Sequence, residues 1–157
     1  MAYVQPDLNK VVKKAFRYCA YQERSQQEVR DKLYSWGLHR RDVEQVIGQL
    51  ISDGFLKEER FALAFAGGKF RMKKWGRVKI KIALREKKVS EPLIIQALSS
   101  IDEREYLKTL RNVIASKTKL TIETNPLKKK HKIAAYVIQR GFEPELVWEI
   151  LRSTEEE

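Results

Sequence analysis

The sequence has few of the residues that build disulfide-stabilised, metal-binding or membrane proteins. Its 157 residues include one cysteine, Cys19, which excludes an intramolecular disulfide and a cysteine-rich zinc site. The two histidines, His39 and His131, have no second histidine or cysteine three or four positions away, so we expect no zinc site. No uninterrupted apolar run approaches the roughly 20 residues that a membrane-spanning helix needs.

Targeting and catalytic motifs are also missing. Residues 1–6 lack the charged and apolar blocks of a signal peptide, which together with the single cysteine favours a reducing cytoplasm. Gly67-Gly68-Lys69 lacks the earlier glycine of a phosphate-binding loop, because Leu63 stands there, so we interpret the glycine pair as a helix irregularity or hinge. We expect a cytoplasmic, monomeric protein that is not an enzyme, with Cys19 as a buried structural thiol.

Positive charge is concentrated in the middle of the chain. Lysine and arginine number 32 against 21 acidic residues, which gives a formal net charge of +11. Residues 69–90 alone carry ten basic side chains and one acidic one, Glu86. Because a merely soluble surface mixes the two signs, this segment favours a negatively charged partner. Phe70 and Trp75 lie in it, where aromatic rings can stack on bases or join a core, and for Phe70 we expect the core.

Apolar residues recur with helical periodicity through almost the whole sequence. Val29, Leu33 and Trp36 are spaced four and three residues apart, which places them on one helix face. The one strand-like alternation, residues 120–124, has no hairpin turn beside it, and we interpret it as a loop. The sequence therefore predicts an all-α fold.

Capping patterns mark where helices begin. Ser25 with Glu28 matches a capping box, in which the hydroxyl accepts from a first-turn amide and the carboxylate reaches back to the cap. Asn125 precedes Pro126, a good cap followed by a residue suited to the first helical position.

The sequence also repeats itself. A shift of 51 residues, followed by a further 53, superimposes six apolar positions in three copies. The matching sets are Val29, Leu33, Leu38, Val43, Val46, Ile47; Ile80, Leu84, Val89, Ile94, Ala97, Leu98; and Ile133, Val137, Phe142, Val147, Ile150, Leu151. In the same alignment Gly37 falls on Lys88 and then on Gly141.

We predict three tandem three-helix repeats, over residues 1–54, 55–101 and 102–157, the last with a short, frayed acidic tail at Glu155–Glu157. The expected helices cover 7–22, 25–37, 40–52, 57–74, 77–88, 91–100, 103–118, 126–140 and 144–153. Repeats in a row contact mainly their neighbours, which predicts an elongated, curved body with a long exposed face. Such a face suits a long partner better than a small substrate.

Three segments resemble the RecX family of bacterial recombinase regulators. Residues 50–62, Leu-Ile-Ser-Asp-Gly-Phe-Leu-Lys-Glu-Glu-Arg-Phe-Ala, are similar to its signature. Residues 25–33 look like its first-unit helix, and Trp75-Gly76-Arg77 like its basic glycine-containing turn. Arg77 stands where the family often has proline, and Gly67-Gly68 interrupts a helix usually free of glycine. The resemblance covers about residues 10–152.

The resemblance implies a function and a partner. Members of this family bind the RecA filament on single-stranded DNA, lie in its deep groove and bridge protomers. They thereby damp its ATP hydrolysis, strand exchange and co-protease action. They are tandem three-helix proteins and need no cofactor, so none is expected here.

The candidate binding residues follow from the basic segment. On a helix over 77–88 the cations are spaced four, four and three residues apart and form one stripe, which should point outward, beside the face of Ile80 and Leu84. Lys73 and Lys74 end the preceding helix nearby. The primary candidates are therefore Lys73, Lys74, Arg77, Lys81, Arg85 and Lys88, with a second patch at Lys128, Lys129 and Lys132. Contacts with phosphates or an acidic filament wall would weaken steeply with salt.

Two other functions compete with a RecA-filament regulator. A helix-turn-helix-like transcription regulator would explain the glycine turns, but the cations do not line the second helix of each turn. A structural adaptor with a peptide groove is the third hypothesis.

Overall fold

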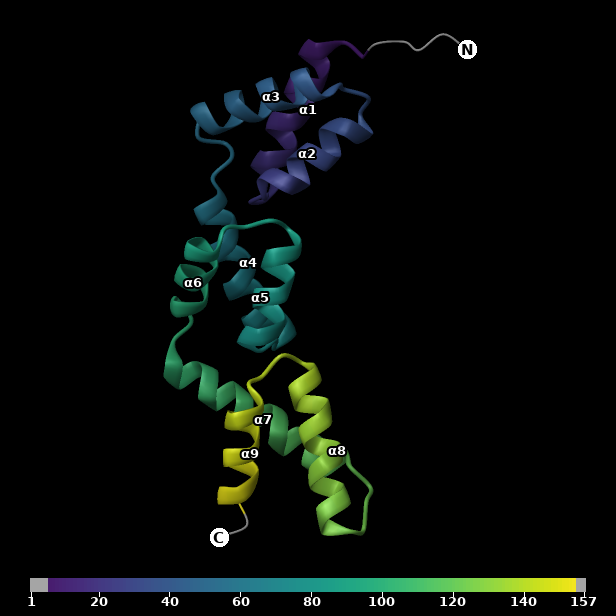
Figure 1. Ribbon diagram of the computed structural model, residues 1–157, viewed down its shortest axis with the longest axis vertical. Helices are drawn as coiled ribbons and strands as arrows, with labels where there is room; N and C mark the ends of the chain where they lie inside the picture. The colour runs from purple at the N-terminus through teal and green to yellow at the C-terminus, as the bar shows by residue number, and fades with distance from the viewer. Residues whose placement is uncertain (1–5, 155–157) are drawn as a thin grey trace, which may run out of the picture.

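The computed structural model describes residues 6–154, and within that range the chain is entirely helical apart from its connections (Figure 1). The predicted all-α fold is confirmed. The helices are α1 (Leu8–Tyr21), α2 (Gln26–Ser35), α3 (Arg40–Ser52), α4 (Glu58–Lys73), α5 (Arg77–Glu86), α6 (Glu91–Ser99), α7 (Glu103–Leu120), α8 (Pro126–Gln139) and α9 (Pro144–Ser153). The acidic tail at Glu155–Glu157 lies outside the described residues.

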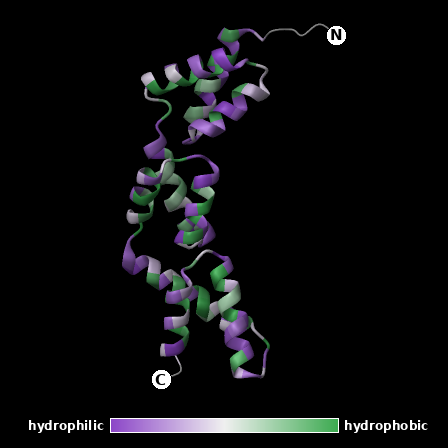
Figure 2. Ribbon diagram, viewed as in Figure 1, coloured by the Kyte–Doolittle hydropathy of each residue, from purple (hydrophilic) through white to green (hydrophobic). Residues whose placement is uncertain are grey.

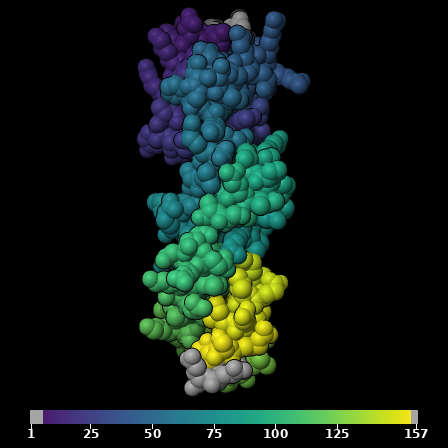
Figure 3. All heavy atoms as spheres, turned by 90° about the vertical axis from the view of Figure 1, so that its left-hand side faces the viewer, coloured from purple at the N-terminus to yellow at the C-terminus, as the bar shows by residue number. Residues whose placement is uncertain are grey.

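The helices form an elongated body. Helices α1–α3 lie at one end, α4–α6 in the middle and α7–α9 at the other end (Figure 1). The space-filling view in Figure 3 shows the same order along one long surface. We propose the ranges 1–54, 55–101 and 102–157 as structural units and name them units one, two and three. Within residues 6–154, no helix is long and apolar enough to cross a membrane.

Among residues 6–154, the buried side chains form two hydrophobic cores. One core belongs to unit one and includes Val29, Leu33 and the thiol of Cys19, together with Leu56 from the start of unit two. The other core runs without a break through units two and three. Green and purple alternate along the helices in Figure 2, as expected when each helix buries one face. The prediction that Cys19 is buried is confirmed, and burial raises the pKa of its thiol.

The repeat predicted the core positions well. Of the eighteen superimposed apolar residues, all are buried except Leu98 and Ile150, which are partly buried and pack against the second core. Gly37, Lys88 and Gly141, which superimpose in the alignment, have positive φ values of 90°, 60° and 102°. The three units therefore share the left-handed turn between their second and third helices as well as their core pattern.

Hydrogen bonds and ion pairs link units one and two. They join Arg60 to Glu23, Gln26 to Glu58 and Lys87 to Glu28, at 3.0, 3.1 and 3.5 Å. Burial raises the pKa of the Glu58 carboxyl, because it removes water from the charged form.

The capping box predicted at Ser25 and Glu28 is only half formed. Ser25 Oγ accepts from the Glu28 amide at 3.0 Å, but the Glu28 carboxylate turns to Lys87 and Glu58 takes the Gln26 amide.

Two local predictions had opposite outcomes. Asn125 caps α8 through the Lys128 amide at 3.1 Å, and residues 121–125 connect α7 to α8 without a strand, as expected. The helix irregularity expected at Gly67-Gly68 is wrong, since α4 runs through both glycines. Gly67 is buried, and a Cβ there would lie 2.7 Å from Nη1 of Arg71, so the glycine makes room for a folded-back arginine.

Candidate partner-binding surface

The basic segment forms the end of α4, a sharp turn and the whole of α5. Helix α4 ends with Lys74 in the left-handed conformation, at φ 54° and ψ 45°. Gly76 then caps α5, which begins at Arg77. This turn brings the start of α5 against unit three rather than leaving it in solvent.

Arg77 is held inside the molecule by unit three. Its guanidinium lies 3.0 Å from Glu143 Oε2, pairs also with Glu103, and stacks 3.8 Å from the centre of the Tyr106 ring. Its side chain is only 25% exposed. The expectation that the whole basic stripe points outward is therefore wrong for Arg77. The carboxylates that neutralise it lie 26 and 66 residues away, so no local pattern could reveal them.

Tyr106 organises this junction. Its ring is fully buried between Phe70 and Phe142, with ring centres at 5.7 and 5.4 Å. Its hydroxyl accepts from the Arg77 amide at 3.1 Å and donates to Glu143. Burial raises the pKa of Tyr106 far above its usual range, and the Glu143 carboxylate raises it further. The expectation that Phe70 is a core residue is confirmed by the same contacts.

The backbones of units two and three also touch directly. The Gly76 amide donates to the Arg140 carbonyl, and the Val78 amide to the Gly141 carbonyl, both at 2.9 Å. A Cβ on Gly76 would lie 2.3 Å from the backbone of Gly141 and Phe142. Only glycine permits this approach at position 76, which explains the Trp-Gly-Arg turn.

The other cations of the basic segment face solvent to different degrees. Arg85 is exposed but pairs with Glu91 at 2.6 Å, which lowers the pKa of that carboxyl. Lys81 is half-buried, and it has no carboxylate at ion-pair distance among residues 6–154. The same holds for three exposed lysines, Lys73, Lys74 and Lys88, so four of the six candidates form no ion pair with a described carboxylate.

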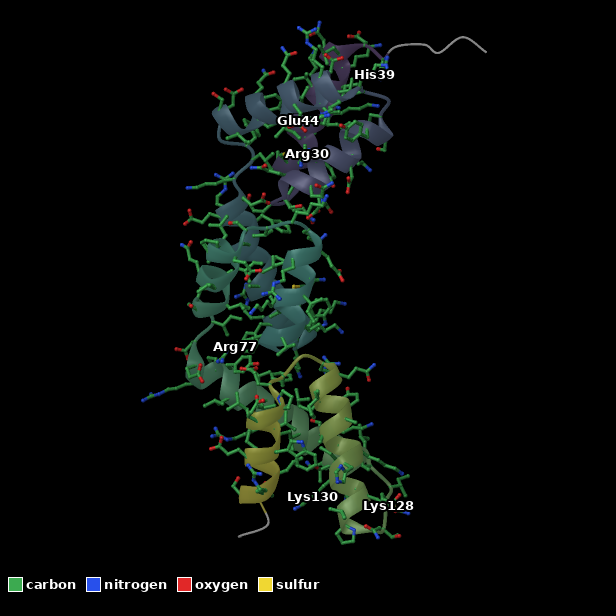
Figure 4. The ribbon with its side chains drawn as sticks, in the orientation of Figure 1. Arg30, His39, Glu44, Arg77, Lys128 and Lys130 are labelled. Carbon is green, nitrogen blue, oxygen red and sulfur yellow. The ribbon has the colours of Figure 1, made fainter. Side chains whose placement is uncertain are left out.

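The second predicted patch lies at the far end of unit three, at the start of α8. Lys132 pairs with Glu123 at 2.9 Å and lowers the pKa of that carboxyl. Lys128 is exposed and Lys129 is half-buried, both in the first turn of α8. Figure 4 places Lys128 at this end of the body, far from Arg77. The structure therefore separates the two predicted patches.

Trp75 gives the basic segment an aromatic face that the charge pattern only suggested. The Lys69 ammonium lies 4.9 Å and the Lys79 ammonium 4.5 Å from the centre of its ring. Lys69 also lies 5.5 Å from the ring centre of Phe65. These distances are typical of cation–π contacts, which hold the lysines without neutralising them. Lys69 and Lys79 were not among the predicted binding residues, although both lie in the basic segment, residues 69–90.

A hollow of about 400 Å³ opens beside this aromatic face, between α2 of unit one and α4 and α5 of unit two. Phe65, Trp75 and Lys69 line one side of it. Glu28 and Asp31 of unit one line the other, so the hollow carries both charges. Four predicted lysines of the basic segment lie outside this hollow, and we name them the cationic surface: Lys73, Lys74, Lys81 and Lys88.

Two family models match this chain. One is described as RecX, first three-helix domain, over residues 13–50, and the other as RecX, second three-helix domain, over residues 58–98. The chain belongs to the RecX family. The two matched ranges cover most of the helical residues of units one and two, including Trp75 and the whole basic segment, residues 69–90.

Curated relatives carry the same family name. The chain is 30% identical over 133 residues to the regulatory protein RecX of Clostridium acetobutylicum, covering 82% of this chain and 61% of that protein's length. It is 27% identical over 146 residues to RecX of Prosthecochloris aestuarii, covering 92% and 93% of the two chains. The chain thus spans about three fifths of the clostridial relative and nearly all of the other.

A solved structure shares the fold. The crystal structure of RecX from Lactobacillus salivarius superimposes with a TM-score of 0.83, at 20% identity, over 96% of this chain and 97% of that one. This chain therefore has the fold of that RecX protein over nearly its whole length.

Proposed function

We propose that this RecX-family protein binds the RecA filament on single-stranded DNA and damps its ATP hydrolysis, strand exchange and co-protease action. It acts by binding in the cytoplasm and catalyses no reaction. One observation supports this most directly: the chain is similar both in sequence and in fold to regulatory proteins of the RecX family. A chain of units laid end to end offers contacts to several subunits of a polymer at once.

The unpaired lysines of unit two are the proposed contact with the filament. Lys73, Lys81 and Lys88 have no carboxylate at ion-pair distance within residues 6–154, so their ammonium groups are available to a partner. Arg77 is removed from this set, because its role is to join units two and three. Each phosphate or carboxylate that these lysines contact adds to the salt dependence of binding.

The decisive measurement is the rate of DNA-dependent ATP hydrolysis by RecA as the protein is added. We expect the rate to fall at fewer than one molecule per RecA subunit, because one elongated molecule contacts several subunits. If the rate never falls while the protein binds duplex DNA tightly, the transcription-regulator hypothesis replaces this one.

A charge-reversal pair locates the contact. Lys73→Glu with Lys81→Glu should raise the concentration needed for half-inhibition about tenfold, since two attractive charges become repulsive. Lys10→Glu with Lys13→Glu, on exposed positions of α1, is the matched control with the same change in net charge. Equal losses for the two pairs would show that net charge, and not this surface, governs binding.

A further inference from the structure

A second basic site lies where unit three meets the end of α4, and Lys74 is the one residue that it shares with the predicted patches. Helices α7 and α8 and the end of α4 enclose a hollow of about 280 Å³, which we name the unit-three pocket. It is lined by Lys74, Asn112, Val113, Ser116, Lys117, Leu120, Tyr136 and Arg140. Three of these side chains are cationic and none is acidic, although the chain as a whole carries 21 acidic residues.

The cations of the pocket gather around one aromatic ring. The Lys117 ammonium lies 4.5 Å from the centre of the Tyr136 ring, and the Arg140 guanidinium 5.8 Å from it. The ring is 38% exposed, so one part of it remains open to a ligand. Neither cation has a carboxylate at ion-pair distance among the residues that the structure describes.

Arg140 is fixed in place before any ligand arrives. One of its Nη2 hydrogens is donated to the Lys73 carbonyl, at the end of α4. A guanidinium has five N–H donors in a rigid fork, so the remaining donors can still contact an oxyanion. Asn112 and Ser116 add neutral hydrogen-bonding groups one helical turn apart on α7. A prearranged arginine lowers the entropy that binding must overcome.

We propose that the unit-three pocket binds a phosphodiester of single-stranded DNA, with Lys74, Lys117 and Arg140 around the phosphate and Tyr136 against the adjoining base. Its volume lies just below the range of about 300–1,000 Å³ that holds whole small molecules, so it suits one unit of a longer chain. Cations beside an exposed aromatic ring are the combination that single strands use, since phosphate and flat base alternate along them. The proposal deepens the proposed function by naming a DNA contact, and it can be tested without RecA.

The test compares two lysines on the same helix. Lys117 lines the pocket, whereas Lys119, two positions further on α7, lines a different hollow next to α9. Binding of a fluorescent 20-nucleotide oligothymidine is followed by anisotropy at several salt concentrations. We expect Lys117→Glu to raise the Kd about tenfold and to reduce the salt slope by about one, and Lys119→Glu to raise it less than twofold.

The ring is tested separately. Tyr136→Leu should raise the Kd about fivefold or more, because stacking on a base is lost. Tyr34→Leu, at a comparably exposed tyrosine of α2, is the control. Circular dichroism of each variant checks that the helices persist.

Three outcomes of the oligonucleotide measurements overturn the proposal: equal weakening by Lys117→Glu and Lys119→Glu, no weakening by either, or no binding by the unmodified protein at low salt. Weakened binding of Lys117→Glu to DNA-free RecA, with DNA binding intact, would also overturn it in favour of an acidic protein surface. Inhibition of RecA ATP hydrolysis is measured in parallel. Its persistence in any of these cases leaves the proposed function standing.

Discussion

Lys88 occupies a backbone conformation that disfavours any residue with a side chain. Its φ of 60° lies in the left-handed region, and the equivalent positions in units one and three are Gly37 and Gly141. The Cβ of a lysine in this region costs about 1 kcal/mol relative to glycine. Lys88 is exposed, so no packing offsets that cost. Lysine at this position therefore lowers the stability of the protein but adds a positive charge to the surface proposed to bind the filament.

Replacing Lys88 by glycine should therefore stabilise the protein. We expect Lys88→Gly to raise the free energy of unfolding by about 0.5–1 kcal/mol, measured by urea denaturation. Lys81→Gly, in the interior of α5, is the control and should lower it by about 1 kcal/mol. A loss of stability in Lys88→Gly would contradict the strain argument.

For single residues, the sequence predicted which side chains are buried far better than which side chains form ion pairs. The apolar spacing identified Ile80 and Leu84 correctly, because burial follows helix periodicity and needs only local information. The same spacing placed Arg77 on the outward face, since nothing near it signals Glu103 or Glu143. Ion pairs between units depend on how the units dock, which a local pattern does not contain.

Among the elements, the turn between α4 and α5 determines how units two and three join. Gly76 and Gly141 approach so closely that two backbone hydrogen bonds cross between the units. This contact extends the core formed around Tyr106 and makes the two units one packed body. Helix boundaries were predictable within about two residues, but this approach was not, because a glycine signals a turn without showing what lies against it.

Alanine at position 76 should disrupt this joint. Gly76→Ala places a Cβ 2.3 Å from backbone atoms that cannot move aside, so we expect a loss of about 1–3 kcal/mol in the free energy of unfolding. Gly48→Ala is the matched control, since Gly48 lies within α3 with nothing within 4 Å of its Cβ position. That variant should gain about 1 kcal/mol in thermal or urea unfolding. Similar effects of both variants would refute the close approach.

At the scale of the whole molecule, the residues that the structure describes form two packed bodies, although the sequence repeats three times. Unit one has its own core and meets unit two through Glu23, Glu28 and Glu58 and their partners, whereas units two and three share a core. The threefold repeat could not reveal this difference, because it describes each unit and not the surfaces between them. The repeat could not predict the unit-three pocket either, because its three cations come from different helices that meet only in the folded chain.

Truncating a buried leucine in each core should show, by amide hydrogen exchange, that the two bodies lose protection separately. Leu33→Ala should destabilise unit one by about 2–5 kcal/mol and speed amide exchange in α1–α3 while α4–α9 stay protected. Leu84→Ala, equally buried, should speed exchange in α4–α9 together. Uniform loss of protection along the chain in both variants would show a single cooperative body instead.

The burial of Cys19 makes the protein well suited to site-specific labelling. Its sulfur lies inside unit one and its raised pKa keeps the thiolate scarce, so maleimide dyes will react slowly with it. A cysteine introduced at an exposed position of unit three would take the dye almost alone, with the natural residue left unchanged. Fluorescence energy transfer between that dye and a fluorophore on DNA would then report how far unit three lies from the DNA.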